Sequence, residues 1–149
     1  MSSEPVKVSS PHKALSLSTV NNMIEKAFNY AKKKGFKPLC VVVLDAGGHV
    51  KACQKQDGCL GISRFEIAKG KAYGALSCGN SSRWLNEQAA TRPHFLEGLS
   101  NTTGGKIISV PGGLLIKYGE EIIGELYLYR FSCKTLAIFL RNKTKNTTK

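Results

Sequence analysis

The first regular hydrophobic pattern in the chain has the spacing of an α-helix. Apolar residues recur every three or four positions, which places them on one helical face: Leu17, Val20, Ile24, Ala27, Phe28 and Ala31. Ser16 or Ser18 can cap the start of this helix with a side-chain oxygen. Gly35 suits its end, because glycine adopts the left-handed conformation without strain. The pattern predicts an amphipathic helix that ends just before Gly35.

The second pattern is a short continuous apolar run, Leu39–Leu44, which contains three consecutive valines. A run of this length that is rich in β-branched residues predicts a strand buried on both faces. Asp45 follows the run, and Gly47 and Gly48 can take the positive φ angles of a tight turn. A return strand is expected from His49 to about Gln54. The pattern therefore predicts a β-hairpin.

A second helix is predicted after the hairpin. Ser63 and Glu66 have the spacing of a capping box, and Ile62 precedes them where it can form a hydrophobic staple. Gly70 and Gly74 lie inside this helix, where each costs up to about 1 kcal/mol relative to alanine. We therefore expect another backbone or a ligand to approach the helix closely at these two glycines.

The second half of the chain contains shorter segments separated by turns. A short helical piece is predicted around Arg83–Ala90 and another turn near His94–Leu99. Strands are predicted at Lys106–Val110, Leu114–Tyr118 and Ile122–Tyr129, and a last helix at Cys133–Arg141. With the hairpin, these strands make a five-stranded antiparallel sheet with helices packed on it. The element order is α-β-β-α-(α)-β-β-β-α, which is an α+β fold.

Length and composition indicate one domain. The chain has 149 residues, of which 42% are hydrophobic and 21% charged, as in ordinary globular proteins. We interpret residues 1–14 as a flexible lead-in, residues 15–141 as the domain and residues 142–149 as a basic polar tail. The first residues lack the apolar segment of a signal peptide, and no apolar run is long enough to span a membrane. The five cysteines form no CxxC pair, so a cytoplasmic protein with free thiols is expected.

The net charge of +12 is concentrated toward the C-terminal end. From residue 126 onward the chain has six basic residues and no acidic one: Arg130, Lys134, Arg141, Lys143, Lys145 and Lys149. Such a segment can bind nucleic acid or an anionic surface weakly, but a solvated tail is the simpler interpretation. Binding of nucleic acid through the tail is kept only as an alternative.

Four ordered blocks of the sequence resemble one known family. They are the hairpin Val41–Val50; Asp57-Gly58; Ser63 followed by Ile67-Ala68 and Lys71-Ala72; and Pro111-Gly112-Gly113 followed by Gly119 and Ile123-Gly124. In this order they resemble the GlcG/HbpS family of haem-degrading-domain-like proteins. That family also includes the C-terminal domain of some propanediol-utilisation corrinoid adenosyltransferases. After Gly124 the chain departs from the family pattern, because Glu125–Arg130 replaces a strand of small residues.

The resemblance implies a profilin-like fold with a five-stranded antiparallel sheet, and it implies assembly into a homo-oligomer. It also implies a small ligand, namely haem or a related tetrapyrrole or corrinoid. Our leading hypothesis is therefore a cytosolic binding protein for such a ligand. A small-molecule enzyme, or an accessory subunit of one, is the alternative, although the chain contains no recognised catalytic motif.

His49 is the leading candidate for contact with the ligand, because a neutral imidazole ligates haem iron or a divalent metal. It can equally cap the hairpin turn by hydrogen bonding, and the sequence leaves both roles open. His12 and His94 are further candidates for axial ligands, but for each a surface histidine is the simpler interpretation. Cys53 shares a strand face with His49, but no other residues complete a zinc site, so zinc is rejected.

The turn beside His49 supplies further candidate contacts. Asp45, Gly47 and Gly48 all lie within reach of a ligand bound at the hairpin. Asp45 has a second explanation, because aspartate commonly stabilises a turn by accepting hydrogen bonds from its own backbone. That structural role is the favoured one for Asp45.

The second helix supplies the remaining candidates. Its N-terminal end attracts anions, and Lys69 or Lys71 can pair with anionic groups such as haem propionates. Lys71 is preferred because it matches the family motif. Ser63 also belongs to that motif, and its hydroxyl is better explained as a helix cap than as a nucleophile.

Overall fold

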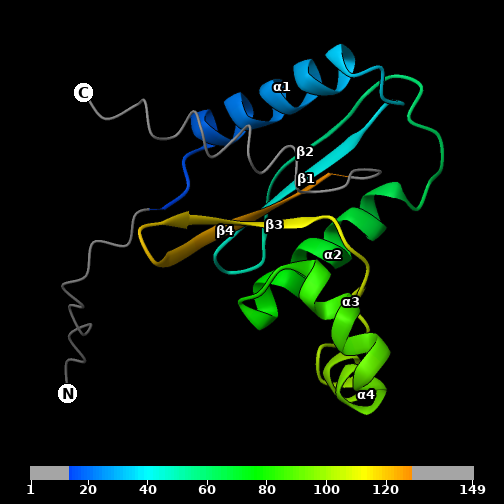
Figure 1. The fold of residues 1–149 in the computed structure, drawn as a ribbon. Coiled ribbons are helices and arrows are strands. Elements are labelled where there is room, and N and C mark those ends of the chain that lie inside the picture. The colour runs from blue at the N-terminus through cyan, green and yellow to red at the C-terminus, as the bar shows by residue number, and fades with distance from the viewer. Residues whose placement is uncertain (1–13, 129–149) are drawn as a thin grey trace, which may run out of the picture.

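The continuous apolar run forms β1, Cys40–Asp45, at an inner position of a four-stranded sheet. The computed structural model describes residues 14–128 and gives the strand order β2-β1-β4-β3 (Figure 1). The other strands are β2, Val50–Lys55, β3, Gly113–Tyr118, and β4, Glu121–Leu128, and all neighbouring strands are antiparallel. Every side chain from Cys40 to Leu44 is fully buried, which confirms the prediction of a strand buried on both faces.

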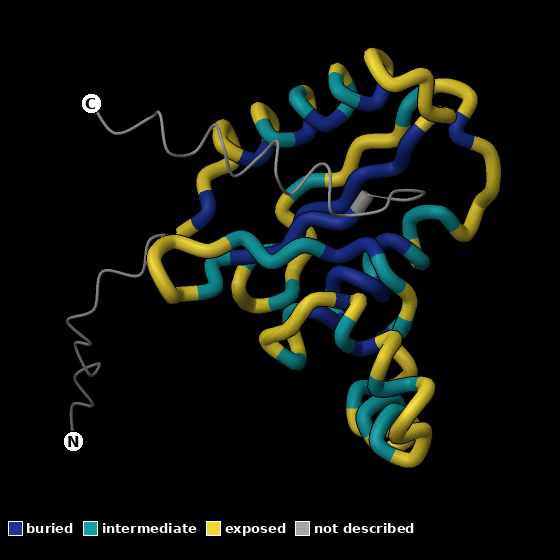
Figure 2. The backbone as a smooth tube through the Cα atoms, viewed as in Figure 1, coloured by how far each residue is buried: buried dark blue, intermediate teal, exposed yellow. Residues whose placement is uncertain are grey.

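Helices cover both faces of this sheet (Figure 1). α1, Leu17–Lys33, packs on the face that carries Val41 and Val43, whereas α2, Arg64–Cys78, packs on the opposite face against Val42. Figure 2 shows the same layering, with buried residues concentrated in the inner strands and on the inner sides of the helices. The α+β class predicted from the sequence is confirmed. Within residues 14–128, none of the helices combines the length and hydrophobicity that a membrane span requires.

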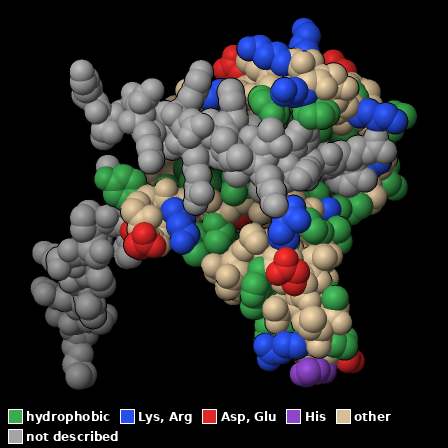
Figure 3. Space-filling model, in the orientation of Figure 1, with side chains coloured by type: hydrophobic (Ala, Val, Ile, Leu, Met, Phe, Trp, Pro, Cys, Tyr) green, Lys and Arg blue, Asp and Glu red, His purple; other side chains and the backbone are tan. Residues whose placement is uncertain are grey.

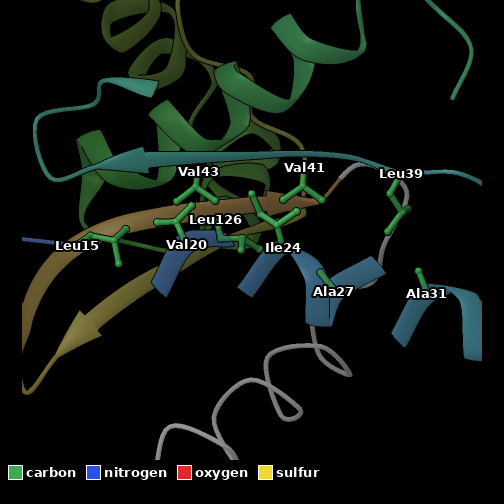
Figure 4. Close-up of a cluster of buried hydrophobic side chains, with 9 residues drawn as sticks. All are labelled: Leu15, Val20, Ile24, Ala27, Ala31, Leu39, Val41, Val43 and Leu126. Atoms are coloured by element: carbon green, nitrogen blue, oxygen red, sulfur yellow. The ribbon is translucent and has the colours of Figure 1, made fainter. Parts of the chain in front are cut away.

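The ends of α1 lie where the sequence predicts them. Ser16 Oγ accepts a hydrogen bond from the Thr19 backbone N–H at 3.2 Å, and Gly35 has a φ of 67° just beyond the last turn. The inner face carries the predicted apolar stripe, of which Val20, Ile24, Ala27 and Ala31 are buried (Figure 4). The amphipathic pattern therefore decides which side of α1 faces the sheet.

The start of α2 differs from the prediction. Ser63 has helical backbone angles, with φ −79° and ψ 0°, and its side chain makes no capping hydrogen bond. A capping serine needs an extended backbone so that its oxygen turns back to the helix, and Ser63 lacks it. Ile62 is 102% exposed and forms no staple. The predicted capping box and staple are wrong, and the Arg64 Nε donates instead to the Leu60 carbonyl at 2.7 Å.

The helical piece predicted after α2 is present, and the segment predicted as a turn near His94–Leu99 is a second helix. α3, Ser82–Thr91, is capped by Ser81, whose Oγ accepts a hydrogen bond from the Trp84 N–H at 3.3 Å. α4, Pro93–Thr102, begins with a proline, which suits the first turn because the backbone N–H groups there have no partner within the helix. The helix projects from the sheet and has no buried residue (Figure 1). The predicted last helix, Cys133–Arg141, and the basic tail lie outside the described residues.

The prediction of a fifth strand at Lys106–Val110 is wrong. This segment lies across α2, where the Ile108 backbone N–H donates to the Gly70 carbonyl at 3.1 Å. The two helix glycines permit the approach, because a Cβ at Gly70 would lie 2.8 Å from Ile108 and one at Gly74 would lie 3.0 Å from Ile107. The close approach expected at these glycines is confirmed. It also keeps the segment out of the sheet, which has four strands among the described residues.

Gly70→Ala is expected to lower the free energy of unfolding by about 1–3 kcal/mol, because the new methyl group overlaps Ile108. Gly98→Ala in α4 is the matched control. A Cβ there meets nothing within 4 Å, so alanine should raise the free energy of unfolding by up to about 1 kcal/mol through its helix propensity. Urea denaturation of both variants measures the difference. Equal effects of the two substitutions would contradict close packing of residues 106–110 on α2.

Candidate functional site

Asp45 closes the hairpin turn with its own side chain. Its Oδ1 accepts hydrogen bonds from the backbone N–H groups of Gly47 at 2.9 Å and His49 at 3.0 Å. Gly48 donates to the Asp45 carbonyl at 3.0 Å and has a φ of 79°, which glycine adopts without strain. Burial by itself would raise the pKa of the Asp45 carboxyl, but the N–H groups of His49 and Gly47 lower that pKa below its ordinary value. The turn is thus held by contacts among its own residues.

The turn presents the imidazole of His49 at the surface. The side chain is 82% exposed, and its Nδ1 lies 3.4 Å from Asp45 Oδ1. A carboxylate beside Nδ1 favours a proton on that nitrogen and leaves the lone pair of Nε2 free for an external partner. Because Asp45 already satisfies the backbone of the turn, the imidazole is not needed to cap it.

A cavity of about 500 Å³ lies between this turn and α2, and we call it the hairpin pocket. Three segments line it: Gly48, His49 and Val50 from the hairpin, Glu66, Lys69, Gly70 and Tyr73 from α2, and Gly105, Lys106 and Ile108 from the segment that crosses α2. Pockets for small organic ligands have volumes of about 300–1,000 Å³. The hairpin pocket therefore has the size that a small ligand requires.

The lining of the hairpin pocket combines apolar surface with two ammonium groups, those of Lys69 and Lys106, and one carboxyl group, that of Glu66. Lys106 Nζ lies 5.8 Å from the centroid of the Tyr73 ring, and Gly48 is so close to this ring that a Cβ would lie 3.2 Å from Tyr73 Cε2. Lys69 Nζ lies 5.6 Å from the centroid of the Phe65 ring. Cation–π attraction holds both ammonium groups beside aromatic rings. This arrangement suits a flat apolar molecule with anionic groups at its edge.

Lys71, the lysine preferred from the sequence, does not line the hairpin pocket. It is 7% exposed, and its Nζ donates a hydrogen bond to the Tyr127 hydroxyl at 2.7 Å on the side of α2 that faces the sheet. Burial lowers the pKa of Lys71. The helical spacing in the sequence already indicated that Lys71 is buried, because Lys71 follows Ala68 by three positions and shares its buried face. Lys69 lies off that face and reaches the pocket.

The predicted residues of the turn divide between two cavities. Gly48 lines the hairpin pocket, whereas Asp45 and Gly47 line a separate cavity of about 320 Å³. His49 lines both cavities and is the residue that they share. The structure therefore brings His49 and Gly48 together with α2, and it places Asp45 and Gly47 on the other side of the imidazole.

The remaining predicted residues lie apart from the hairpin pocket, and two of its residues were missed. Ser63 and His94 are not part of its lining, and His12 lies outside the described residues. Tyr73 and Lys106 were not predicted, because neither belongs to a motif and only packing of the crossing segment brings Lys106 to α2. The sequence did contain one signal for Tyr73: it follows Lys69 by four positions, so the two side chains share one face of the predicted helix.

Residues 15–128 match the protein family described as haem degrading protein HbpS-like. The chain belongs to this family. The resemblance drawn from the hairpin, the second helix and the glycine-marked turns is thereby confirmed. A comparison with curated proteins found no match.

Solved structures share the fold of this HbpS-like chain. The protein ORFY of Klebsiella pneumoniae has a TM-score of 0.73 at 21% identity, over 92% of this chain and 93% of ORFY. A complex of PduOC with haem has a TM-score of 0.70 at 22% identity, over 86% of this chain and 91% of PduOC. A double mutant of HbpS from Streptomyces reticuli has a TM-score of 0.71 at 18% identity, over 100% of both chains. At these identities, the likeness establishes the fold.

Residues 14–128 contain no group of three or more His, Cys, Asp or Glu side chains that could hold a metal ion.

Asp45→Asn is expected to remove part of the pH dependence of stability of this HbpS-like chain. Because the pKa of Asp45 is lower in the folded state, its carboxylate stabilises the fold above the unfolded pKa, and this stabilisation is lost as the pH falls through the folded pKa. Wild type should therefore be more stable than Asp45→Asn near about pH 7, and the two should converge toward about pH 3.

Thermal unfolding across this pH range measures the effect. Asp57→Asn, which changes an exposed turn residue, is the control and should follow wild type. Asp45→Ala removes the acceptor as well and should cost about 1–2 kcal/mol near neutral pH. Parallel pH profiles of wild type and Asp45→Asn would contradict the role of the Asp45 carboxylate in the turn.

Proposed function

We propose that this HbpS-like chain binds haem, or a related tetrapyrrole, in the hairpin pocket, where His49 would ligate the iron. One observation carries the proposal: the pocket brings an exposed imidazole, an aromatic wall and two ammonium groups together around about 500 Å³. The family to which the chain belongs is described as haem-degrading, and PduOC, a protein of the same fold, forms a complex with haem. The function proposed is binding of the ligand, with no catalytic residue assigned.

The residues of the hairpin pocket fit the chemistry of haem. Haem is a flat apolar ring with two carboxylates at one edge, and its iron accepts nitrogen ligands along the axis. His49 would supply Nε2 to the iron, with Asp45 beside Nδ1 to orient the ring. Lys69 and Lys106 would pair with the carboxylates, and the Tyr73 ring would pack on the apolar surface. Bound haem would supply a redox-active iron.

The other candidate contacts take different places in this proposal. Gly48 lines the hairpin pocket, and its lack of a Cβ lets the Tyr73 ring pack against the turn. His12 is proposed as a second histidine from the segment that precedes residue 14. Ser63 and Lys71 are left out of the contact set, because neither lines the hairpin pocket.

Further properties of the protein also stay predictions. A corrinoid is a second ligand of related chemistry, and a homo-oligomer and a cytoplasmic location are proposed with it. The profilin-like description of the fold is part of the same proposal. Binding of nucleic acid through the basic tail stays the alternative, and the tail lies outside the described residues, which Figure 3 shows coloured by side-chain type.

Titration of the purified chain with hemin is expected to give a saturable shift of the Soret band. His49→Ala should weaken binding by at least about tenfold, because it removes the bond to iron, and should alter the shape of the band. Lys69→Ala and Lys106→Ala should each weaken binding by about two- to fivefold, as expected for exposed ion pairs. A corrinoid titrated in parallel distinguishes the two ligand classes.

Two matched variants serve as controls for this titration. His94→Ala removes a histidine from α4, and Lys33→Ala removes an exposed lysine from α1, and neither residue lines the hairpin pocket. Both should bind hemin like wild type. A shift that does not saturate, or one that His49→Ala leaves unchanged, would overturn the proposed binding mode.

A further inference from the structure

Glu125 is a fully buried carboxyl in the middle of the sheet. It lies in β4 opposite Leu44 of β1 and Leu115 of β3, and it is 0% exposed. Neither carboxyl oxygen has a hydrogen-bond partner of standard geometry among residues 14–128. A buried polar group without a partner destabilises a fold, and a buried unpaired charge does so far more strongly. The packing around Glu125 is therefore compatible with a neutral carboxyl and not with an ionised one.

The carboxyl lies at the corner where α2, α3 and the start of β3 meet. Gly113 packs so closely on Glu125 Oε1 that no Cβ fits there. The Gly113 N–H donates to Ser82 Oγ at 2.6 Å, which ties the start of β3 to the first residue of α3. A Cβ at Gly113 would also lie 3.4 Å from the Ala75 side chain of α2. A charge on Glu125 would thus act on all three elements at once.

The groups around Glu125 supply little compensation for a charge. α2 contributes Lys71, whose Nζ donates to the Tyr127 hydroxyl of β4, and Cys78 lies further along the same helix. α3 contributes Ser82, which does not titrate, and the residues opposite on β1 and β3 are leucines. Burial raises the pKa of the Glu125 carboxyl well above its ordinary value. The nearby Leu114 backbone N–H, which does not reach standard hydrogen-bond geometry, lowers the pKa by a smaller amount. Burial also raises the pKa of Cys78 and lowers that of Lys71.

This corner is connected to the hairpin pocket by one short segment. Residues 106–113 run from the pocket, where Lys106 and Ile108 line the wall, to Gly113 against Glu125. Between these ends, Ile107 packs near Gly74 of α2. A shift of Gly113 away from Glu125 therefore moves the segment that forms one wall of the pocket.

We propose that Glu125 is a proton-dependent latch. With its carboxyl neutral, Gly113 and the corner of α2 and α3 pack against β4, and residues 106–110 pack on α2. Loss of the proton releases this corner and loosens the wall of the hairpin pocket. Release of the corner is independent of any ligand, whereas the effect on ligand affinity rests on the proposed function.

Trp84 reports on the corner directly. It is the only tryptophan in the chain, it lies in the first turn of α3, and it makes an edge contact with Phe95 at 6.3 Å. Because the folded-state pKa of Glu125 is raised, the packing is stable below the unfolded pKa and is lost as the pH rises through the folded pKa. As the pH is raised from roughly 5 to 9, acrylamide quenching of Trp84 should rise in a single step that accompanies the release of one proton.

Two variants remove the titrating group at similar volume, Glu125→Gln and Glu125→Met, and both should lose the step. Glu120→Gln, which changes an exposed acid in the β3–β4 turn, is the control and should keep it. A step that persists in Glu125→Gln or Glu125→Met, or its absence from wild type, would overturn the latch. Because the two variants differ in polarity, a folding defect in one leaves the other as the test.

Hemin binding at several pH values tests the connection to the pocket. Above the Trp84 step, wild-type affinity should fall by up to about tenfold per pH unit, because one proton is linked to binding, and Glu125→Gln should lose this dependence. If the hemin affinity of wild type and of Glu125→Gln depends equally on pH, the connection between the Glu125 corner and the hairpin pocket is overturned, and the Trp84 result is unaffected. Absence of hemin binding at every pH would overturn the proposed function and leave the latch to be decided by Trp84.

Discussion

Burial of β1 on both faces is the constraint on which the rest of the structure depends. Val41 and Val43 fill the layer under α1, whereas Val42 and Leu44 fill the layer under α2. Each such side chain contributes about 1.5–3 kcal/mol when fully buried. Because β1 pairs with β2 on one side and with β4 on the other, its register also places the hairpin turn at the edge of both layers. The site at this turn is therefore anchored by the core.

α2 serves two surfaces with its opposite sides. One side carries alanines, such as Ala68 and Ala72, which let the helix lie close to the sheet. Another side carries Gly70 and Gly74, which admit the backbone of residues 106–110. Lys69 and Tyr73 remain for the hairpin pocket. Small residues on two sides of one helix explain why its hydrophobic pattern is weak and why its contacts are difficult to assign from spacing alone.

Glu125 breaks the usual rule that a buried polar group finds a partner. It lies next to Gly124, where a Cβ would lie 2.5 Å from the Leu44 carbonyl and where the chain leaves its family pattern. The strand pairing across β1, β4 and β3 is continuous through this position, so the sheet tolerates the carboxyl in its neutral form. A local conflict of this kind makes one corner of the fold sensitive to protons, while among residues 14–128 the core on the α1 side carries no such group.

The sequence by itself determined the elements whose signals are local. The apolar stripe of α1, the double burial of β1 and the turn held by Asp45 follow from side chains that act on their own helix, strand or turn. The tertiary structure alone decided that residues 106–110 cross α2 instead of joining the sheet, because that choice depends on space left by Gly70 and Gly74. The tertiary structure also decided that Lys69 and Lys106 line one pocket with His49 while Lys71 is buried, because segments distant in the chain form that pocket. Helix caps, turns and apolar stripes depend on residues that are neighbours in the sequence, whereas a pocket depends on packing between elements far apart in the chain.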